Sequence, residues 1–247
     1  MPDPIDLYFW PTPNGWKVSI ALEEMGLPYR CHLVDIGAGD QHKPEFLRIS
    51  PNNRIPAIAD PDGPDGAPVN IFESGAILLY LARKTGRFMG ESARDRIAVE
   101  EWLMWQMGGV GPMAGQAHHF LKFAPEDIPY AKDRYRGEVA RLYGVLDRRL
   151  ARTRHVAGDF YSIADMAIWP WYSRIIEGGA YNDADTFLDG ASYTNVARWT
   201  KLVGARPTVR RGQMVNKAMG NPAMQLRERH NASDFETKTQ DKLEAAE

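Results

Sequence analysis

The sequence is short of several things, and each shortage excludes a class of protein. Its 247 residues contain one cysteine, Cys31. One cysteine forms no internal disulfide, no CxxC redox pair and no cysteine-rich zinc site, so we expect a reduced, cytoplasmic protein. The longest apolar run covers residues 76–82, far fewer than the roughly 20 residues of a membrane-spanning helix. The acidic, proline-interrupted start lacks the basic segment of a signal peptide.

An excess of charge of one sign is also missing. The 30 basic residues nearly balance the 32 acidic ones, so the net charge of −2 offers no general attraction to nucleic acid or an anionic membrane. Arginines cluster in residues 134–154, but Asp133 and Glu138 interleave with them, as on a solvated helix face. The adjacent His118 and His119 would point in different directions on a helix, so we expect no metal site there.

The pattern of apolar residues changes along the chain. Residues 1–86 alternate strand-like and helix-like segments, residues 92–220 carry helical periodicity, and residues 221–247 form a polar tail. We therefore expect an α/β N-terminal domain, an all-α C-terminal domain and a partly disordered tail. The first domain should contain strands 5–9, 29–34, 57–59 and 69–72 (the last two a hairpin), a loop at 11–15, and helices 18–25 and 74–84 ended by Gly26 and Gly86. The second should contain helices within 100–107, 130–154, 163–176, 196–203 and 208–219.

Two patterns in the second domain predict packing rather than chemistry. Ser162 followed by Asp165 has the spacing of a capping box, which satisfies free N–H groups at a helix N-terminus. Apolar residues recur at helical spacing along residues 130–154, as on the core-facing stripe of an amphipathic helix. The residues of this stripe are Val139, Leu142, Tyr143, Leu146 and Leu150.

Pro56 stands where an apolar strand begins, an awkward place for a residue that donates no hydrogen bond to a sheet. A cis Ile55–Pro56 bond in a tight turn is one solution, and an ordinary proline turn is the other. With the cis bond, the N–H and C=O of Ile55 would be unpaired. They would then hydrogen-bond an extended peptide as an added strand.

Two further segments lie at junctions between strand and helix. Ser74 is a candidate N-cap, and a helix N-terminus binds carboxylates, while Glu73 beside it would take an ammonium. That pair suits an α-amino acid head group. Thr12 and Asn14 follow the first strand, where they would donate hydrogen bonds and lower the pKa of a nearby thiol. Simple capping and turn formation remain the alternative for both segments.

The order of these segments resembles the soluble glutathione transferases. The motifs are most similar to the nu class, which is related to the yeast prion regulator with a transferase fold. They are residues 8–15 (YFWPTPNG), 45–53 (EFLRISPNN), 72–81 (FESGAILLYL) and 105–113 (WQMGGVGPM). The resemblance covers about residues 5–215 and leaves out the tail. It implies a thioredoxin-like N-terminal domain, an all-α C-terminal domain, and glutathione as the bound cofactor.

The resemblance assigns residues to the sulfur and to the glycyl end of glutathione. Thr12 and Asn14 match the pair beside the sulfur. This class lacks the catalytic Tyr, Ser or Cys of other transferase classes, and residues 8–16 here contain no Ser or Cys. Gln41 and Lys43 fall where polar side chains hold the glycyl end.

The same resemblance assigns the remainder of the tripeptide. The backbone of Ile55, before Pro56, would pair with the cysteinyl residue, and Glu73 and Ser74 would hold the γ-glutamyl amine and carboxylate. Arg134 matches a class arginine near a second glutathione. The candidates for the wall of a substrate pocket are Trp10, Trp16, His119 and Tyr130.

The resemblance implies a disulfide-bond reductase in which bound glutathione attacks as a thiolate, so that the catalytic sulfurs belong to the ligands. Attack on a thioether or an electrophilic aromatic carbon, as in a lyase, β-etherase or conjugating transferase, remains open. A regulatory or binding protein with little turnover is the alternative of another class. We expect a homodimer, no nucleic-acid or membrane partner, and an inert core role for Cys31.

Overall fold

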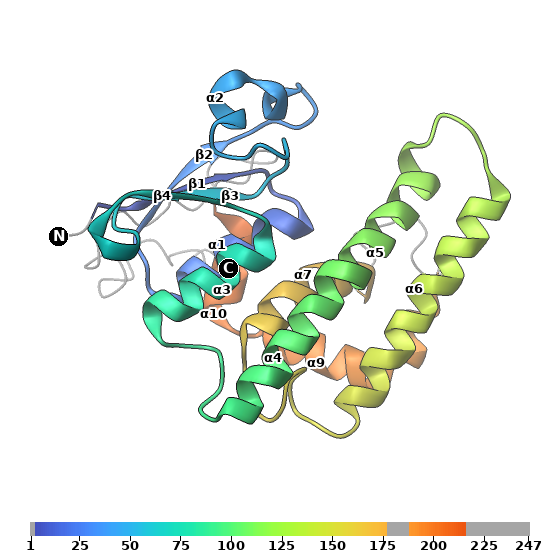
Figure 1. The fold of residues 1–247 in the computed structure, drawn as a ribbon. Coiled ribbons are helices and arrows are strands. Elements are labelled where there is room, and N and C mark those ends of the chain that lie inside the picture. Colours follow the sequence, from blue (N-terminus) through green and yellow to red (C-terminus); the bar gives the residue numbers. More distant parts are fainter. Residues whose placement is uncertain (1–2, 177–187, 216–247) are drawn as a thin grey trace, which may run out of the picture. The chain divides into compact units, whose positions relative to one another are not determined.

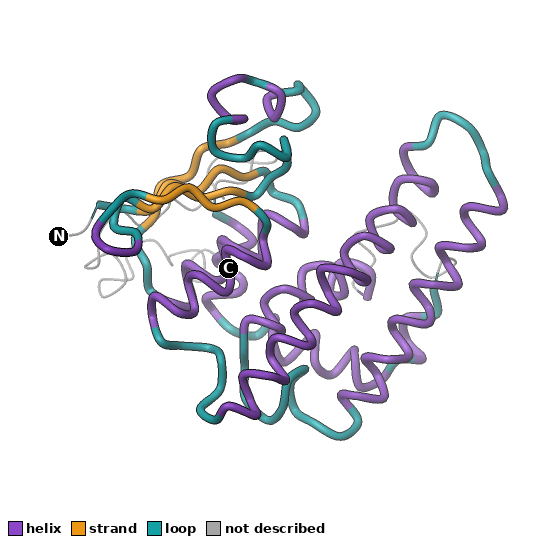
Figure 2. The backbone as a smooth tube through the Cα atoms, viewed as in Figure 1, coloured by secondary structure: helices purple, strands orange, loops and turns teal. Residues whose placement is uncertain are grey.

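The computed structural model describes residues 3–176 and 188–215, which divide into two compact units. The first contains the chain up to Gly86 together with the segment from Arg206, and the second is Arg87–Ala205. Within the described residues, the sheet lies in the first unit and the second unit is helical, as predicted (Figure 2). The expected polar tail, residues 221–247, lies outside the described residues.

A four-stranded sheet in the order β2–β1–β3–β4 forms the centre of the first unit. β1 pairs in parallel with β2, whereas β3 runs antiparallel to β1 and to β4. This is the mixed sheet of a thioredoxin-like domain, and it contains the predicted hairpin. The strands are β1 (Ile5–Phe9), β2 (Tyr29–Leu33), β3 (Ala57–Asp60) and β4 (Val69–Phe72).

Helices lie on both faces of this sheet (Figure 1). Ile5, Leu7 and Phe9 alternate onto one face and are buried. That face carries α1 and α3, and the opposite face carries α2. Gly26 and Gly86 end α1 and α3 in the left-handed conformation, as predicted, with φ of 68° and 67°. The helical segments are α1 (Pro13–Met25), η1 (Asp40–His42), α2 (Pro44–Leu47), η2 (Pro64–Gly66) and α3 (Ser74–Thr85).

The helix α10 (Pro207–Met214) belongs to the first unit, although the sequence places it in the helical domain 92–220. It packs against α1. Arg211 Nε lies 2.9 Å from Glu23 Oε1, and both side chains are buried. Helical periodicity predicts a helix, but it does not tell which partner buries the apolar face, so the domain boundary differs.

The second unit begins with a nearly continuous helix that contains two π-helical turns. The predicted apolar stripe of α6 is confirmed, because all five of its residues are buried. No helix of the described residues is long and apolar enough to cross a membrane. The helical segments are α4 (Ala93–Trp105), η3 (Gln106–Val110), α5 (Gly111–His118), η4 (His119–Phe123), α6 (Pro129–Leu150), α7 (Ile163–Ile176), η5 (Gly190–Ser192) and α9 (Thr194–Gly204).

Asp165 connects three parts of the second unit, which extends its predicted capping role. Its Oδ2 accepts hydrogen bonds from the N–H and hydroxyl of Ser162 at 3.0 and 3.1 Å. Its Oδ1 accepts from the N–H of Val156 at 3.0 Å and from Nε1 of Trp199 at 2.8 Å. Because Asp165 is fully buried, these contacts join the start of α7, the loop before it and α9.

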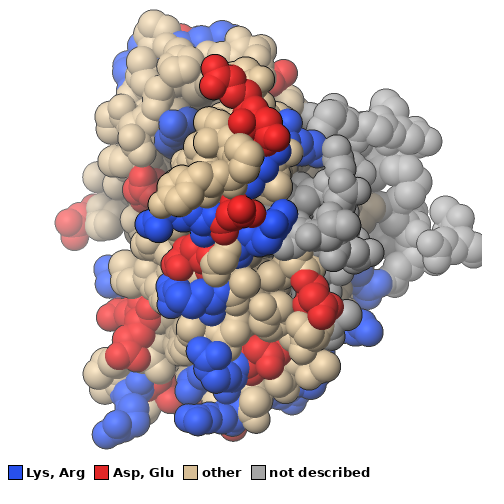
Figure 3. Space-filling view, turned by 90° about the vertical axis from the view of Figure 1, so that its right-hand side faces the viewer, with Lys and Arg blue, Asp and Glu red and all other residues tan. Residues whose placement is uncertain are grey.

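The face of the second unit that carries α6 mixes charges of both signs (Figure 3). Arg136 pairs with Asp133 at 3.2 Å, and Arg141 pairs with Glu138 at 2.7 Å, each within one helical turn. Arg136 and Arg141 thus belong to a mixed, solvated helix surface, as predicted. Arg149 differs, because it is half-buried and donates to the backbone carbonyls of Val156 and Ala157, each at 2.8 Å.

Candidate functional site

Three of the predicted site segments meet at one end of the sheet. In the strand pairing, Tyr8 lies opposite Ala57, and Ala57 lies opposite Phe72. The C-terminal ends of β1 and β4 therefore flank the N-terminal end of β3. The segments predicted for the sulfur, the cysteinyl residue and the γ-glutamyl end follow β1, precede β3 and follow β4, respectively. The fold thus places these predicted contacts side by side.

Thr12 is the N-cap of α1, and its Oγ1 accepts a hydrogen bond from the N–H of Gly15 at 3.3 Å. The helix begins at Pro13, inside the predicted loop 11–15, because proline is favoured in a first turn, where its missing N–H would have no partner. A hydroxyl both donates and accepts, so the capping Thr12 retains its O–H as a donor. Together with the helix dipole and Asn14, this donor makes the turn suited to an anionic sulfur.

Ile55 has the free backbone groups that strand addition requires. The Ile55–Pro56 bond is cis, and Ile55 forms no backbone hydrogen bond with the described part of the chain. Its half-buried side chain packs against a cluster that includes Val34 and Phe46. The side chain therefore fixes this segment on the unit, while its N–H and C=O are available to an extended peptide.

The prediction that Ser74 is an N-cap is wrong. Glu73 occupies the N-cap position, with φ of 71° and ψ of 113°, and Ser74 is the first residue of α3. The chain turns into the helix one residue early, through a left-handed backbone that is unfavourable for a residue with a side chain. Asn52 Nδ2 donates to Glu73 Oε1 at 3.2 Å and orients this exposed carboxylate. Ser74 remains buried at the positive end of the α3 dipole.

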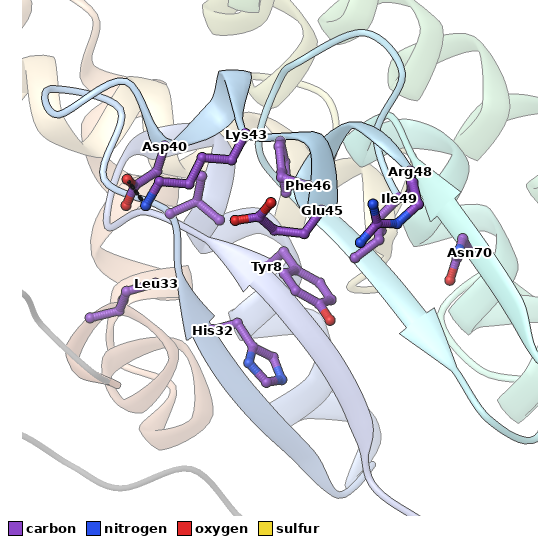
Figure 4. Close-up of a pocket in the computed structure, with 11 residues that line it drawn as sticks. Tyr8, His32, Leu33, Asp40, Lys43, Glu45, Phe46, Arg48, Ile49 and Asn70 are labelled. Atoms are coloured by element: carbon purple, nitrogen blue, oxygen red, sulfur yellow. Dashed lines mark ion pairs between the residues drawn. The ribbon is translucent and has the colours of Figure 1, made fainter.

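Gln41 and Lys43 lie between β2 and α2. Gln41 Nε2 donates to a backbone carbonyl at 3.4 Å. Lys43 Nζ forms a 2.6 Å ion pair with Asp40 and lowers the pKa of that carboxyl by hydrogen bonding (Figure 4). Asp40 and Lys43 both border a cavity of about 590 Å³ on the α2 side of the sheet, where the rings of Tyr8 and His32 stack.

The remaining predicted contacts belong to the second unit. His119 lies in η4, and Tyr130 and Arg134 lie on α6. All three side chains are exposed. Arg134 lines a cavity of about 380 Å³ with Met113 of α5 and Glu138 of α6.

The two tryptophans predicted for a substrate pocket flank the Thr12 turn. Trp10 and Trp16 are both half-buried. The carbonyl of Trp10 accepts the N–H of Thr12 at 2.7 Å, so the position of Trp10 is tied to the cap of α1.

Cys31 is half-buried on β2, not in the core as predicted. Its neighbours on the same side of the strand differ, since Tyr29 is fully buried and Leu33 is 45% exposed. β2 is an edge strand, so alternation alone did not predict how far its inner face is covered.

Lys17 is a residue of the site region that sequence reasoning missed. It is 1% exposed and lies three residues after Asn14 on α1. Burial lowers the pKa of its amine to about 7, an effect that the negative charge of Glu73 partly opposes. The available signal was its helical spacing from Asn14, which the usual exposure of lysine obscured.

The chain matches known proteins over both units. Residues 12–84 match the N-terminal domain, and residues 110–207 the C-terminal domain, of glutathione S-transferase. Over 245 residues it is 47% identical to the disulfide-bond oxidoreductase YghU of Escherichia coli, covering 97% of this chain and 84% of the relative. Over 215 residues it is 51% identical to the disulfide-bond oxidoreductase YfcG of the same organism, covering 87% of this chain and 95% of the relative.

A solved structure shows the same similarity in three dimensions. It is a glutathione transferase from Burkholderia graminis, with two glutathione molecules bound per subunit, and it matches with a TM-score of 0.83 at 47% identity. The match covers 88% of this chain and 90% of that chain. This agreement confirms the resemblance read from the motifs. The chain belongs to the glutathione S-transferase family and is of the nu-class type represented by YghU and YfcG.

Proposed function

We propose that the protein is a glutathione-dependent disulfide-bond reductase. The observation that carries this proposal is that the Thr12 turn, the backbone of Ile55 and the Glu73–Ser74 pair meet at one end of the sheet. Two relatives that are 47% and 51% identical bear the name disulfide-bond oxidoreductase. The Burkholderia graminis structure, with two glutathiones per subunit, supports a site for both glutathiones that a disulfide reduction consumes.

One glutathione would lie along the end of the sheet as an added strand. Thr12 and Asn14 would hydrogen-bond its thiolate, and the N–H and C=O of Ile55 would pair with its cysteinyl residue. Glu73 would bind the γ-glutamyl ammonium, and Ser74 would bind the γ-glutamyl carboxylate. This arrangement gives the thiolate and both charged groups of the γ-glutamyl end a group of opposite charge or donors at a helix N-terminus.

The remaining contacts would hold the glycyl end and the second tripeptide. Gln41 and Lys43 would take the glycyl carboxylate, for which Lys43 would exchange part of its pairing with Asp40. Arg134 would bind the second glutathione. The substrate pocket would draw on the following side chains: Trp10, Trp16, His119 and Tyr130.

The reaction would proceed by two thiol–disulfide exchanges. The first thiolate attacks one sulfur of the substrate disulfide, forms a mixed disulfide, and releases the other sulfur as a thiolate that takes a proton. The second glutathione, also as a thiolate, attacks the glutathione sulfur of the mixed disulfide. Glutathione disulfide and the second substrate thiol leave. The protein supplies no sulfur, so its contribution is to orient the reactants and stabilise the thiolates.

The same thiolate would also attack a thioether or an electrophilic aromatic carbon, which keeps lyase, β-etherase or conjugating activity as the second candidate. Robust thioether cleavage without disulfide reduction would favour that candidate, and no turnover on either substrate would favour a regulatory protein. We also propose that the enzyme acts in the cytoplasm, because the reaction consumes reduced glutathione and cytosolic conditions keep glutathione reduced. The family resemblance further leads us to propose a homodimer.

The Thr12→Ala variant tests the thiolate site. We expect its turnover in the reduction of hydroxyethyl disulfide to fall by about 10²-fold, as when one donor to a developing anion is removed. The KM for glutathione should change much less, since the other tripeptide contacts remain. Formation of glutathione disulfide, followed by coupling to glutathione reductase, measures both constants.

Thr12→Ser is the matched control, because it retains the hydroxyl that caps α1 and donates to sulfur. Loss of the cap in Thr12→Ala should cost about 1 kcal/mol of stability, so denaturation curves of both variants are needed. Unchanged turnover in folded Thr12→Ala would refute the role at the sulfur. Turnover that falls equally in both variants would point to packing of the methyl group.

Cys31→Ser tests whether the reactive sulfurs come only from the ligands. The change replaces the thiol of a half-buried edge-strand residue with a hydroxyl of similar size. We expect turnover within about twofold of the wild type, because no step uses a protein thiol. Abolished turnover in a folded Cys31→Ser protein would contradict this mechanism, and mass spectrometry of glutathione-treated protein would then locate the adduct.

A further inference from the structure

Lys17 is a buried basic residue for which the proposed function gives no role. Its side chain is 1% exposed, and it forms no hydrogen bond or ion pair with any residue that the structure describes. Lysine is rarely buried without a partner, because loss of hydration disfavours its charged form. The helix could satisfy its packing with an apolar residue, so a cation at this place needs another explanation.

Lys17 shares a face of α1 with the turn that would hold the thiolate. It lies three residues after Asn14 and four after Pro13, so these residues share one face of α1. Long side chains on a helix incline toward its N-terminus. This inclination would direct the amine of Lys17 toward the first turn, where Thr12 and Asn14 would hold the sulfur.

The charges around Lys17 leave its electrostatic balance incomplete. α1 packs against α3 and α10. Of the charged groups on these elements, Arg83 and Lys84 lie in the last turn of α3, while Glu73 precedes its first turn and is the carboxylate that acts on Lys17. Two arginines of the α10 segment pair with carboxylates of α1: Arg206 with Glu24 at 2.6 Å and Arg211 with Glu23 at 2.9 Å. The third, Arg210, is exposed on the surface of α10. In the complex, Glu73 would also be shared with the γ-glutamyl ammonium.

We propose that Lys17 is the counter-charge of the glutathione thiolate, which it stabilises through space in its ammonium form. This inference rests on the proposed function, because it requires a thiolate at the first turn of α1. Burial lowers the pKa of Lys17 in the free protein to about 7, so in a fraction of the protein molecules its amine is uncharged near neutral pH. When the thiolate forms, the thiol loses its proton to solvent, and uncharged Lys17 gains one from solvent at Nζ. No other bond changes.

A pH titration of bound glutathione tests this coupling in the full-length protein. The ultraviolet absorbance of the thiolate reports its fraction at each pH, with protein in excess over glutathione. In Lys17→Met, which retains the length and packing of the side chain, we expect the titration to move to higher pH. The ratio of thiolate to thiol at a fixed pH should fall about tenfold, the effect of removing a nearby opposite charge.

Three controls separate this effect from general damage. Arg30→Met removes a positive charge from the exposed side of the edge strand β2 in the same unit and should leave the titration unchanged. Lys17→Gln should shift the titration by the same amount as Lys17→Met. It provides a second measurement if Lys17→Met folds poorly. S-methylglutathione, which has no ionisable sulfur, should bind wild type and Lys17→Met with affinities that agree within about twofold.

A thiolate titration in Lys17→Met and Lys17→Gln that agrees with the wild type would overturn the inference. So would an equal loss of affinity for glutathione and S-methylglutathione, because that result would assign Lys17 to packing of the site. The measurement uses no disulfide substrate. A wild type with the expected titration but no disulfide reduction would therefore refute the proposed reaction alone.

Discussion

Replacing Asp165 with alanine should lower the free energy of unfolding by about 3–5 kcal/mol, the usual cost of removing one partner from a buried charged network. Four donors currently share this carboxylate: two on Ser162, the N–H of Val156 and the indole N–H of Trp199. All lie in the interior of the second unit, where water does not replace the lost acceptor. Chemical denaturation followed by tryptophan fluorescence and circular dichroism measures the loss.

Two variants make this measurement specific to the buried network. Asp165→Asn retains one acceptor oxygen but directs an amide N–H toward existing donors, so its loss should be intermediate. Asp133→Ala removes a carboxylate that pairs with Arg136 on the exposed surface of α6, and it should cost less than about 0.5 kcal/mol. Equal stabilities of Asp165→Ala and Asp133→Ala would contradict the assignment of Asp165 as the connection between α7 and α9.

Gly15→Ala should damage both stability and the proposed thiolate site. A Cβ at Gly15 would lie 2.1 Å from the carbonyl oxygen of Trp10 and 3.1 Å from Phe9 Cδ2. The backbone around Trp10 must therefore shift, and the Thr12 cap shifts with it because the N–H of Gly15 bonds to Thr12 Oγ1. We expect overpacking to lower the free energy of unfolding by about 1–3 kcal/mol. We also expect turnover to fall by about 10²-fold, because moving a catalytic group by about 1 Å is enough to cause a loss of that size.

Gly137→Ala is the matched control for this substitution. Its Cβ would meet nothing within 4 Å, and it lies in the middle of α6, where alanine is the better helix former. This variant should gain about 0.5–1 kcal/mol of stability and retain full turnover. If Gly15→Ala behaved as Gly137→Ala does, the turn would tolerate movement, and the tight geometry at Thr12 would not matter for activity.

Local patterns predicted most of the first unit. Alternating apolar residues marked β1, and the turn residues between β3 and β4 marked their hairpin. Gly26 and Gly86 marked the ends of their helices, because only local backbone chemistry determines a left-handed stop. The order of strands and helices, together with the motifs, was then sufficient to indicate the family.

The sequence did not predict features that depend on distant parts of the chain. The early turn at Glu73 depends on backbone angles that the residue types in this segment do not indicate, so the sequence predicts Ser74, rather than Glu73, as the N-cap. The burial of Lys17 depends on helices that follow it by more than fifty residues in the chain. The alternation of residues likewise predicts a core position for Cys31, but β2 is an edge strand, and its position in the sheet is not evident from the sequence.

The return of α10 to α1 has a consequence for synthesis on the ribosome. Gly212 approaches α1 so closely that a Cβ would lie 2.7 Å from Ile20 Cα, and its carbonyl accepts the hydroxyl of Ser19 at 2.6 Å. A nascent chain emerges from its N-terminus and folds in that order, so the helical unit is complete before α10 becomes available. The face of α1 that α10 covers therefore stays open through most of translation. Although it is translated first, the unit that would bind glutathione is completed only after the helical unit has emerged.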